Sequence, residues 1–151
     1  MLFFPFFSFF AFFLYNHFII FLFRRVSMHS YYDLLISLGA HITNKGCRYI
    51  AEAILLLQKT EISAWPTAGL LYQQIAQKFQ VIPNSVSRAI SRVSIHIWSF
   101  GNHQKLQEIL GGTFSEKPAP ADFIFMLANY MNNIGHILPG WFLASKRDAP
   151  R

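Results

Sequence analysis

The chain has 151 residues, a formal net charge of +6 at pH 7 and a single cysteine, Cys47. This length suits one domain with extensions and leaves little room for a second. One cysteine excludes an intrachain disulfide and a metal site built from several cysteines, and it favours a reducing compartment. The excess of basic residues favours a nucleic acid or an anionic membrane surface as partner over an acidic protein.

The first segment is strongly apolar. Residues 1–23 contain no charged residue and eleven phenylalanines, and Arg24 and Arg25 follow directly. One hypothesis is a transmembrane helix whose C-terminal end is held in the cytoplasm by the arginine pair. The other, which we favour, is that translation starts at Met28, so residues 1–27 are excluded from the predicted domain.

After Met28 the apolar residues recur at helical spacing, and no useful strand alternation is present. A helix is predicted to begin near Lys45, after a loop over residues 39–44, because the i, i+3, i+4, i+7 pattern is held by Ile50, Ala53, Ile54 and Leu57. Trp65 and Pro66 then break the chain, since a residue before proline is disfavoured in the α conformation.

Two helices separated by a tight link follow. The first is predicted over residues 70–79 and the link over 80–82. Pro83 suits the first position of the next helix, where its missing N–H would have no partner. That helix is predicted to end at Gly101 as a left-handed residue, and it buries Val86, Ile90, Val93 and Ile97.

The remainder of the chain is also predicted to be helical until its tail. Helices are expected over residues 103–110 and 120–131, with a loop over 111–119 between them. The second packs Ile124, Leu127, Ala128 and Met131. The predicted domain therefore spans residues 28–133, and glycine and proline favour an irregular tail over 134–151.

The short helix, tight link and longer helix together predict a helix-turn-helix motif. In this motif the second helix enters the DNA major groove and the first crosses the phosphate backbone. On the second helix Arg88 is predicted to contact a base, and on the first Lys78 is predicted to position the domain on phosphates. The full set of candidate DNA-binding residues is Lys78, Asn84, Ser85, Ser87, Arg88, Ser91 and Arg92.

The charge pattern of the central region supports this hypothesis. Between Ile62 and Gln107 the sequence has lysine and arginine but no aspartate or glutamate. Protein surfaces usually mix both signs, so this stretch predicts a positive field that attracts a polyanion. Its four cations, Lys78, Arg88, Arg92 and Lys105, predict roughly three to five neutralised phosphates and a log–log salt slope of about −3 to −4.

Other chemistry has weaker support. His41 and Cys47 lack a third group that would orient a nucleophile and a base, so we predict no enzyme activity. His96 and His103 lack a third ligand, so we predict no metal site and no cofactor.

Five segments carry a family resemblance over residues 36–131: "LGAHITNKGCRYIAEAI", "LYQQIAQKF", "SVSRAI", "IWSFGN" and "FIFMLANYM". With them the chain resembles the DNA-binding effector domain of the sporulation stage-zero master response regulator of endospore-forming bacteria. The resemblance implies an all-α, six-helix domain that binds short DNA boxes, often as head-to-tail pairs on tandem sites. It makes transcription regulation in sporulation the expected function.

The resemblance also shows where this chain departs from the family. The family's recognition helix has arginine at the position of Ser85, glutamate at Ser87, arginine at Arg88 and Ser91, and histidine at Arg92, so Arg88 alone is retained. Two arginine contacts are therefore lost, which predicts binding that is weaker or differently specific.

The full-length family member carries an N-terminal phosphoacceptor domain, for which we expect no counterpart here. The chain is therefore predicted to act as a stand-alone cytoplasmic effector without a phosphorylation switch. Expected partners are double-stranded DNA, a second copy arranged head to tail and RNA polymerase, with a membrane only if residues 1–23 are a real segment. The alternative is a protein-interaction module that keeps the fold but has lost base contacts, and that is tethered to a membrane if residues 1–23 are a real segment.

Overall fold

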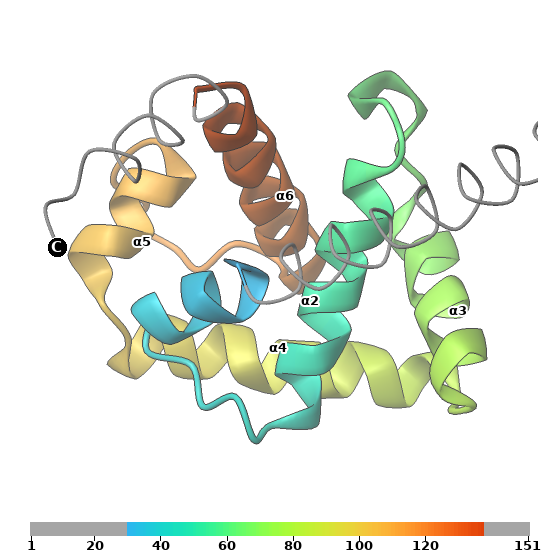
Figure 1. Cartoon of the computed structure of the whole chain (residues 1–151). Helices are drawn as coiled ribbons and strands as arrows, with labels where there is room; N and C mark the ends of the chain where they lie inside the picture. Colours follow the sequence, from blue (N-terminus) through green and yellow to red (C-terminus); the bar gives the residue numbers. More distant parts are fainter. Residues whose placement is uncertain (1–29, 138–151) are drawn as a thin grey trace, which may run out of the picture.

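The computed structural model describes residues 30–137, so the predictions for residues 1–27 and for the tail beyond 137 lie outside it. In the described part a helix over residues 30–37 precedes α2 (Lys45–Gln58), a 3-10 turn η1 (Ile62–Ala64), α3 (Ala68–Phe79), α4 (Pro83–Phe100), α5 (His103–Leu110) and α6 (Pro120–Ile137). All regular structure there is helical (Figure 1). The all-α, six-helix prediction is confirmed.

The core is built around α2. Ten of its 14 residues are buried, as expected for a helix with neighbours on several sides, and it packs against α4, α6 and α3. The predicted core residues Ile50, Ala53, Ile54 and Leu57 are all fully buried. The helix begins after Asn44, whose side-chain oxygen accepts a hydrogen bond from the Gly46 N–H at 3.0 Å.

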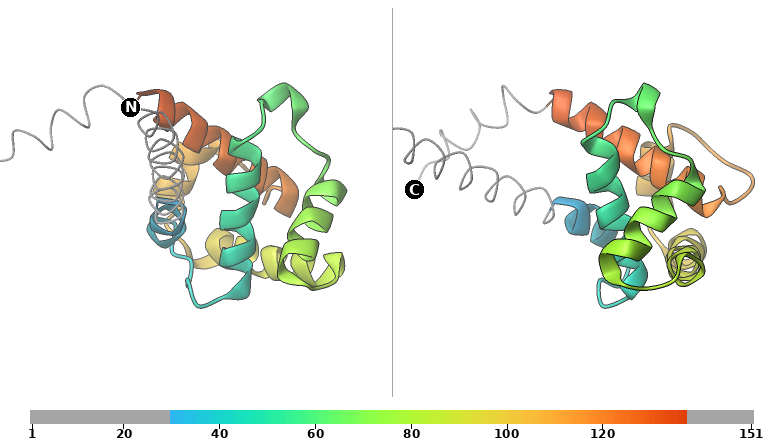
Figure 2. Two further views of the ribbon diagram at one scale, coloured as in Figure 1. Left: turned by 45° about the vertical axis from the view of Figure 1, so that its right-hand side comes forward. Right: turned by 90° about the vertical axis from the view of Figure 1, so that its right-hand side faces the viewer.

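The two helices around the tight link form as predicted, with α3 starting two residues early because Thr67 caps it. In the link, Gln80 adopts the left-handed conformation (φ 54°), and the Val81 N–H donates to the Ala76 carbonyl at 3.0 Å. Pro83 is the first residue of α4, as expected. Figure 2 shows α3 crossing α4 rather than running beside it, which leaves one side of α4 uncovered.

The predicted role of Gly101 is wrong. Its backbone is extended (φ −82°, ψ −173°), not left-handed. A Cβ at this position would lie 2.3 Å from the Leu38 carbonyl oxygen and 2.4 Å from that of Ile97, so glycine is needed for close approach instead. The Asn102 N–H donates to the same Leu38 oxygen at 3.1 Å, and the left-handed residue of this contact is Gly39 (φ 89°).

The last helix is longer than predicted. α6 continues past the expected end at Met131 to Ile137, so the first residues of the predicted irregular tail are helical. Its buried side includes the predicted Ile124, Leu127 and Ala128. Phe125 stacks on Trp65 with ring centroids 5.7 Å apart, and this contact fastens the α2–α3 connection to α6.

Candidate nucleic-acid interface

The predicted DNA-binding residues other than Lys78 lie on α4, most of them on its uncovered side. Asn84, Ser85, Arg88 and Arg92 are exposed, whereas Ser87 and Ser91 are half-buried. The opposite side is anchored by fully or almost fully buried side chains, namely Val86, Ile90, Val93 and Ile97. Because helix residues four apart lie on one face, Asn84, Arg88 and Arg92 follow one another along the exposed side.

The two arginines of this face are not paired with any acidic residue that the structure describes. Across residues 30–137, no carboxylate forms an ion pair with Arg88 or Arg92. Their guanidinium groups are therefore available for base edges or phosphates. Their contact with DNA stays a prediction.

Lys78 is paired with a carboxylate, whereas the sequence predicted a free cation. Its ammonium group forms an ion pair with Glu52, a carboxylate of α2 that is only 3% exposed. A buried carboxylate is costly unless it is paired, so α3 supplies the cation that α2 requires. From the sequence, Lys78 was predicted to be an unpaired cation, because Glu52 lies outside the stretch without aspartate or glutamate, residues 62–107 (the acid-free stretch).

Lys105 is also paired. Its ammonium group lies 3.0 Å from the Glu108 carboxylate and 3.3 Å from the Tyr130 hydroxyl, which itself donates to Glu108 at 3.1 Å. The hydrogen bonds to Glu108 and then Tyr130 raise the pKa of Lys105. The hydrogen bonds from Lys105 and then from Tyr130 lower the pKa of Glu108. Of the four cations in the acid-free stretch, Arg88 and Arg92 are thus the two without an ion-pair partner in the described part of the chain.

Sequence reasoning missed one basic residue beside the motif. Arg48 of α2 is exposed, and its guanidinium carbon lies 5.2 Å from the ring centroid of Phe79, the last residue of α3. The helical phase of α2 could have shown that Arg48 is exposed. Its position next to the link between α3 and α4 depends on how α2 packs, which no local pattern reveals.

The pairing of Lys78 leads to a stability prediction. Lys78→Met leaves the Glu52 carboxylate buried without a cation, and we expect a loss of about 1–2 kcal/mol in unfolding free energy. This is below the cost for a fully enclosed pair because the Lys78 side chain is 40% exposed and water can reach the site. Urea unfolding of the variant measures the loss.

The double variant Lys78→Met/Glu52→Gln is the matched control, since it removes both charges together and should recover most of the lost stability. Full stability in the Lys78→Met single variant would contradict the pairing.

The sulfur and imidazole groups do not form a nucleophilic site. The Cys47 thiol donates to the backbone carbonyl of His41 at 3.2 Å, and burial raises the pKa of this thiol, which keeps it neutral. The His41 ring faces His96 instead, with centroids 5.0 Å apart. In the part of the chain that the structure covers, no three histidine, cysteine or acidic side chains are placed to hold a metal ion.

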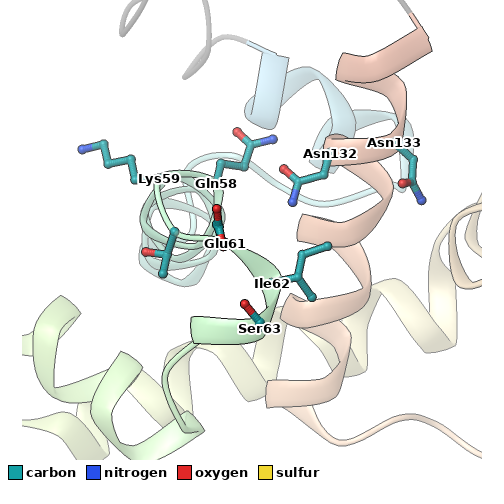
Figure 3. Close-up of a pocket in the computed structure, with 8 residues that line it drawn as sticks. Gln58, Lys59, Glu61, Ile62, Ser63, Asn132 and Asn133 are labelled. Carbon is teal, nitrogen blue, oxygen red and sulfur yellow. The ribbon is translucent and has the colours of Figure 1, made fainter.

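A polar groove lies away from the exposed side of α4. It encloses about 570 Å³ where the end of α2, η1 and α6 meet (Figure 3), and it is lined by Gln58, Lys59, Thr60, Glu61, Ile62, Ser63, Asn132 and Asn133. Lys59 and Glu61 bring both signs of charge to its rim, so the groove has no preference for an anion. It lies at the C-terminal end of α2, whereas the N-terminal end contacts α4.

The α3–link–α4 unit lies within a match to a known family. A family model described as "Sporulation initiation factor Spo0A C terminal" matches residues 31–131, about two thirds of the chain. The chain belongs to this family. The match begins in the helix over residues 30–37 and ends within α6, so it covers all or part of every helix of the described domain.

Membership of the Spo0A C-terminal family confirms the resemblance found in the sequence. The family consists of helical DNA-binding effector domains that regulate sporulation transcription. Among the described residues no helix combines the length and apolar character needed to cross a membrane.

Proposed function

We propose that this chain is a stand-alone, sequence-specific DNA-binding regulator of transcription in the cytoplasm. The observation that carries the proposal is the exposed side of α4 in a member of a DNA-binding family. On this side Arg88 and Arg92 have no ion-pair partner among residues 30–137. Double-stranded DNA is the partner that matches this face in shape and charge.

The binding geometry follows from the packing of the three central helices. α4 enters the major groove with its first turns toward the base edges, so Arg88 in the second turn contacts a base. Arg92 lies one turn further along and contacts a phosphate. Arg48 contacts the DNA phosphate backbone beside the end of α3, because its guanidinium group lies over the ring of Phe79.

The serines on α4 change the expected target. Ser85 and Ser91 stand where the family resemblance implies arginine, and Ser91 is half-buried. A serine hydroxyl makes one short contact where arginine makes a bidentate one. The DNA box is therefore expected to differ from that of the full-length relatives and to be bound more weakly by one domain.

Regulation follows from the same arrangement. The proposed domain binds DNA without phosphorylation, so its level in the cell or competition with a full-length relative sets its effect. A second copy bound head to tail on a tandem box and RNA polymerase are the proposed protein partners.

Salt dependence tests the proposal. One domain on one box should give a log–log slope of about −2 to −3, since Arg88, Arg92 and Arg48 remain for phosphate or base contact. This is shallower than the sequence predicts because Lys78 and Lys105 are already paired with carboxylates. Fluorescence anisotropy with a short duplex over a range of salt concentrations measures the slope.

The variant Arg92→Ser is the internal control of this titration, since losing one phosphate contact should make the slope shallower by about 0.9. A slope near zero for the unmodified protein would reject DNA binding and favour the protein-interaction module.

A further inference from the structure

Two uncharged residues at the start of α4 are exposed beside the arginines, and attraction to phosphate gives them no role. Ile82, the residue before α4, is 65% exposed, and Asn84, the second residue of the helix, is exposed. Both lie at the tip of the recognition helix, the part that meets base edges in a helix-turn-helix motif. Their side chains are therefore the first to reach the floor of the major groove.

Asn84 has no structural task within the described domain. Asparagines also stand at the starts of α2 and α5, where Asn44 and Asn102 each accept a backbone hydrogen bond that caps the helix. Asn84 instead lies inside the first turn of α4, and over residues 30–137 its side-chain amide makes no hydrogen bond to protein. Its donor and acceptor are both available to a ligand.

The chemistry of the two side chains selects the same base pair. A carboxamide donates to adenine N7 and accepts from adenine N6–H₂ in a bidentate pair, which no other base edge in the major groove matches as well. The apolar end of isoleucine fits the C5-methyl group of thymine, the one apolar group in that groove. Both side chains therefore favour A·T over G·C.

The spacing along α4 places this contact relative to Arg88. Asn84 and Arg88 are four residues apart, about 6 Å along the helix axis. Successive base pairs are about 3.4 Å apart, so the two side chains meet pairs about two steps apart. Arg88 favours guanine, whose O6 and N7 accept from its guanidinium group.

We propose that Asn84 and Ile82 are specificity-determining residues that contact adenine and a thymine methyl group, about two base pairs from a guanine contacted by Arg88. The inference rests on the proposed function and adds the composition of the site. The substrate class is thus duplex DNA with an A·T pair at a fixed short distance from a G·C pair.

The first test is a binding-site selection from random duplexes with the unmodified protein, Asn84→Ala and the control Asn129→Ala, an exposed asparagine of α6. The unmodified protein and the control should select an A·T pair about two steps from a G·C pair. Asn84→Ala should lose most of the A·T preference, keeping only the roughly fourfold part that the Ile82 contact supplies. It should keep the G·C preference and bind the selected site about 5- to 150-fold more weakly, as for loss of one bidentate base contact.

The second test isolates Ile82 by replacing the selected thymine with uracil, which lacks only the methyl group. The unmodified protein should lose about fourfold in affinity, the effect of one apolar carbon. Ile82→Ala should bind the two duplexes equally.

Selection without an A·T preference, or an Asn84→Ala variant whose A·T preference is undiminished, would overturn the inference. A G·C preference that depends on Arg88 would still leave the proposed function intact. No selected site with the unmodified protein would overturn both.

Discussion

Replacing Gly46 by alanine is expected to lower the free energy of unfolding by about 2–3 kcal/mol, even though alanine is the better helix former. A Cβ on Gly46 would lie 2.3 Å from the Ala89 carbonyl oxygen, 2.8 Å from its carbonyl carbon and 2.6 Å from Cγ2 of Val93. Two of these atoms belong to the backbone of α4 and cannot turn away. The helices would have to separate, which opens the core between α2 and α4.

Gly69→Ala is the matched control. Gly69 is the second residue of α3, as Gly46 is of α2, but a Cβ there would meet no atom within 4 Å. This variant should keep or gain stability, by up to about 1 kcal/mol. Urea unfolding of both variants measures the contrast, and equal stabilities would show that α2 does not approach α4 this closely.

The same contact matters for the proposed function, because α2 packs against α4 on the side away from its exposed arginines. Val93 and Ala89 lie on the side of α4 that faces Gly46, and Arg92 and Arg88 precede them by one residue each along the chain. A displaced α4 would move these arginines relative to the link and α3. We therefore expect Gly46→Ala to weaken DNA binding even at temperatures where it is folded.

Much of the fold could be predicted from local patterns. The starts of α2, α4 and α5 follow from helical spacing, from Pro83 and from glycine and asparagine at the breaks. These signals act within a few residues, so the sequence contains them directly. The end of α6 was placed early because the glycine and proline content of the last residues favoured an irregular tail, whereas the helix continues to Ile137.

What the sequence could not predict depends on residues far apart. Glu52 and Lys78 are 26 positions apart, and only the packing of α3 on α2 brings them together. Gly101 was assigned a left-handed conformation on its place after a helix, but its role is set by the Leu38 carbonyl. Such close approaches are properties of the assembled core and leave no local signal.

The candidate site also has one part that local sequence patterns predicted and one part that they did not. The exposure of Arg88 and Arg92 followed from the phase of α4, because the buried Val86 and Ile90 fix which side faces solvent. The number of free cations did not follow, since it depends on carboxylates from α2 and from beyond the acid-free stretch. Arg48 was missed for the same reason: it reaches the motif through tertiary packing.

Arg88→Ala is expected to weaken binding to the preferred site by about 1–3 kcal/mol and to remove the preference at one base pair. Arg88 is exposed, has no ion-pair partner in the described domain and matches the family's recognition helix as its resemblance implies. Its loss leaves a guanine edge without its bidentate partner. Binding-site selection and anisotropy on the selected duplex measure the two effects.

The control must remove the same charge without touching the interface or the core. Lys78→Ala, the natural choice from the sequence, is unsuitable because it strands the buried Glu52. Lys59→Ala is suitable, since Lys59 is exposed beyond the last turn of α2, about 20 Å along that helix from the end that meets α4. We expect it to leave both the affinity and the selected sequence unchanged.

Arg92→Ala separates base contact from phosphate contact on the same helix. Because a phosphate carries no sequence information, this variant should weaken all duplexes alike and leave the selected site unchanged. If Arg88→Ala also weakened all duplexes alike, Arg88 would be a phosphate contact. If it changed neither affinity nor preference, α4 would not contact bases through Arg88, and a protein-interaction module that keeps the fold would become the better account of this surface.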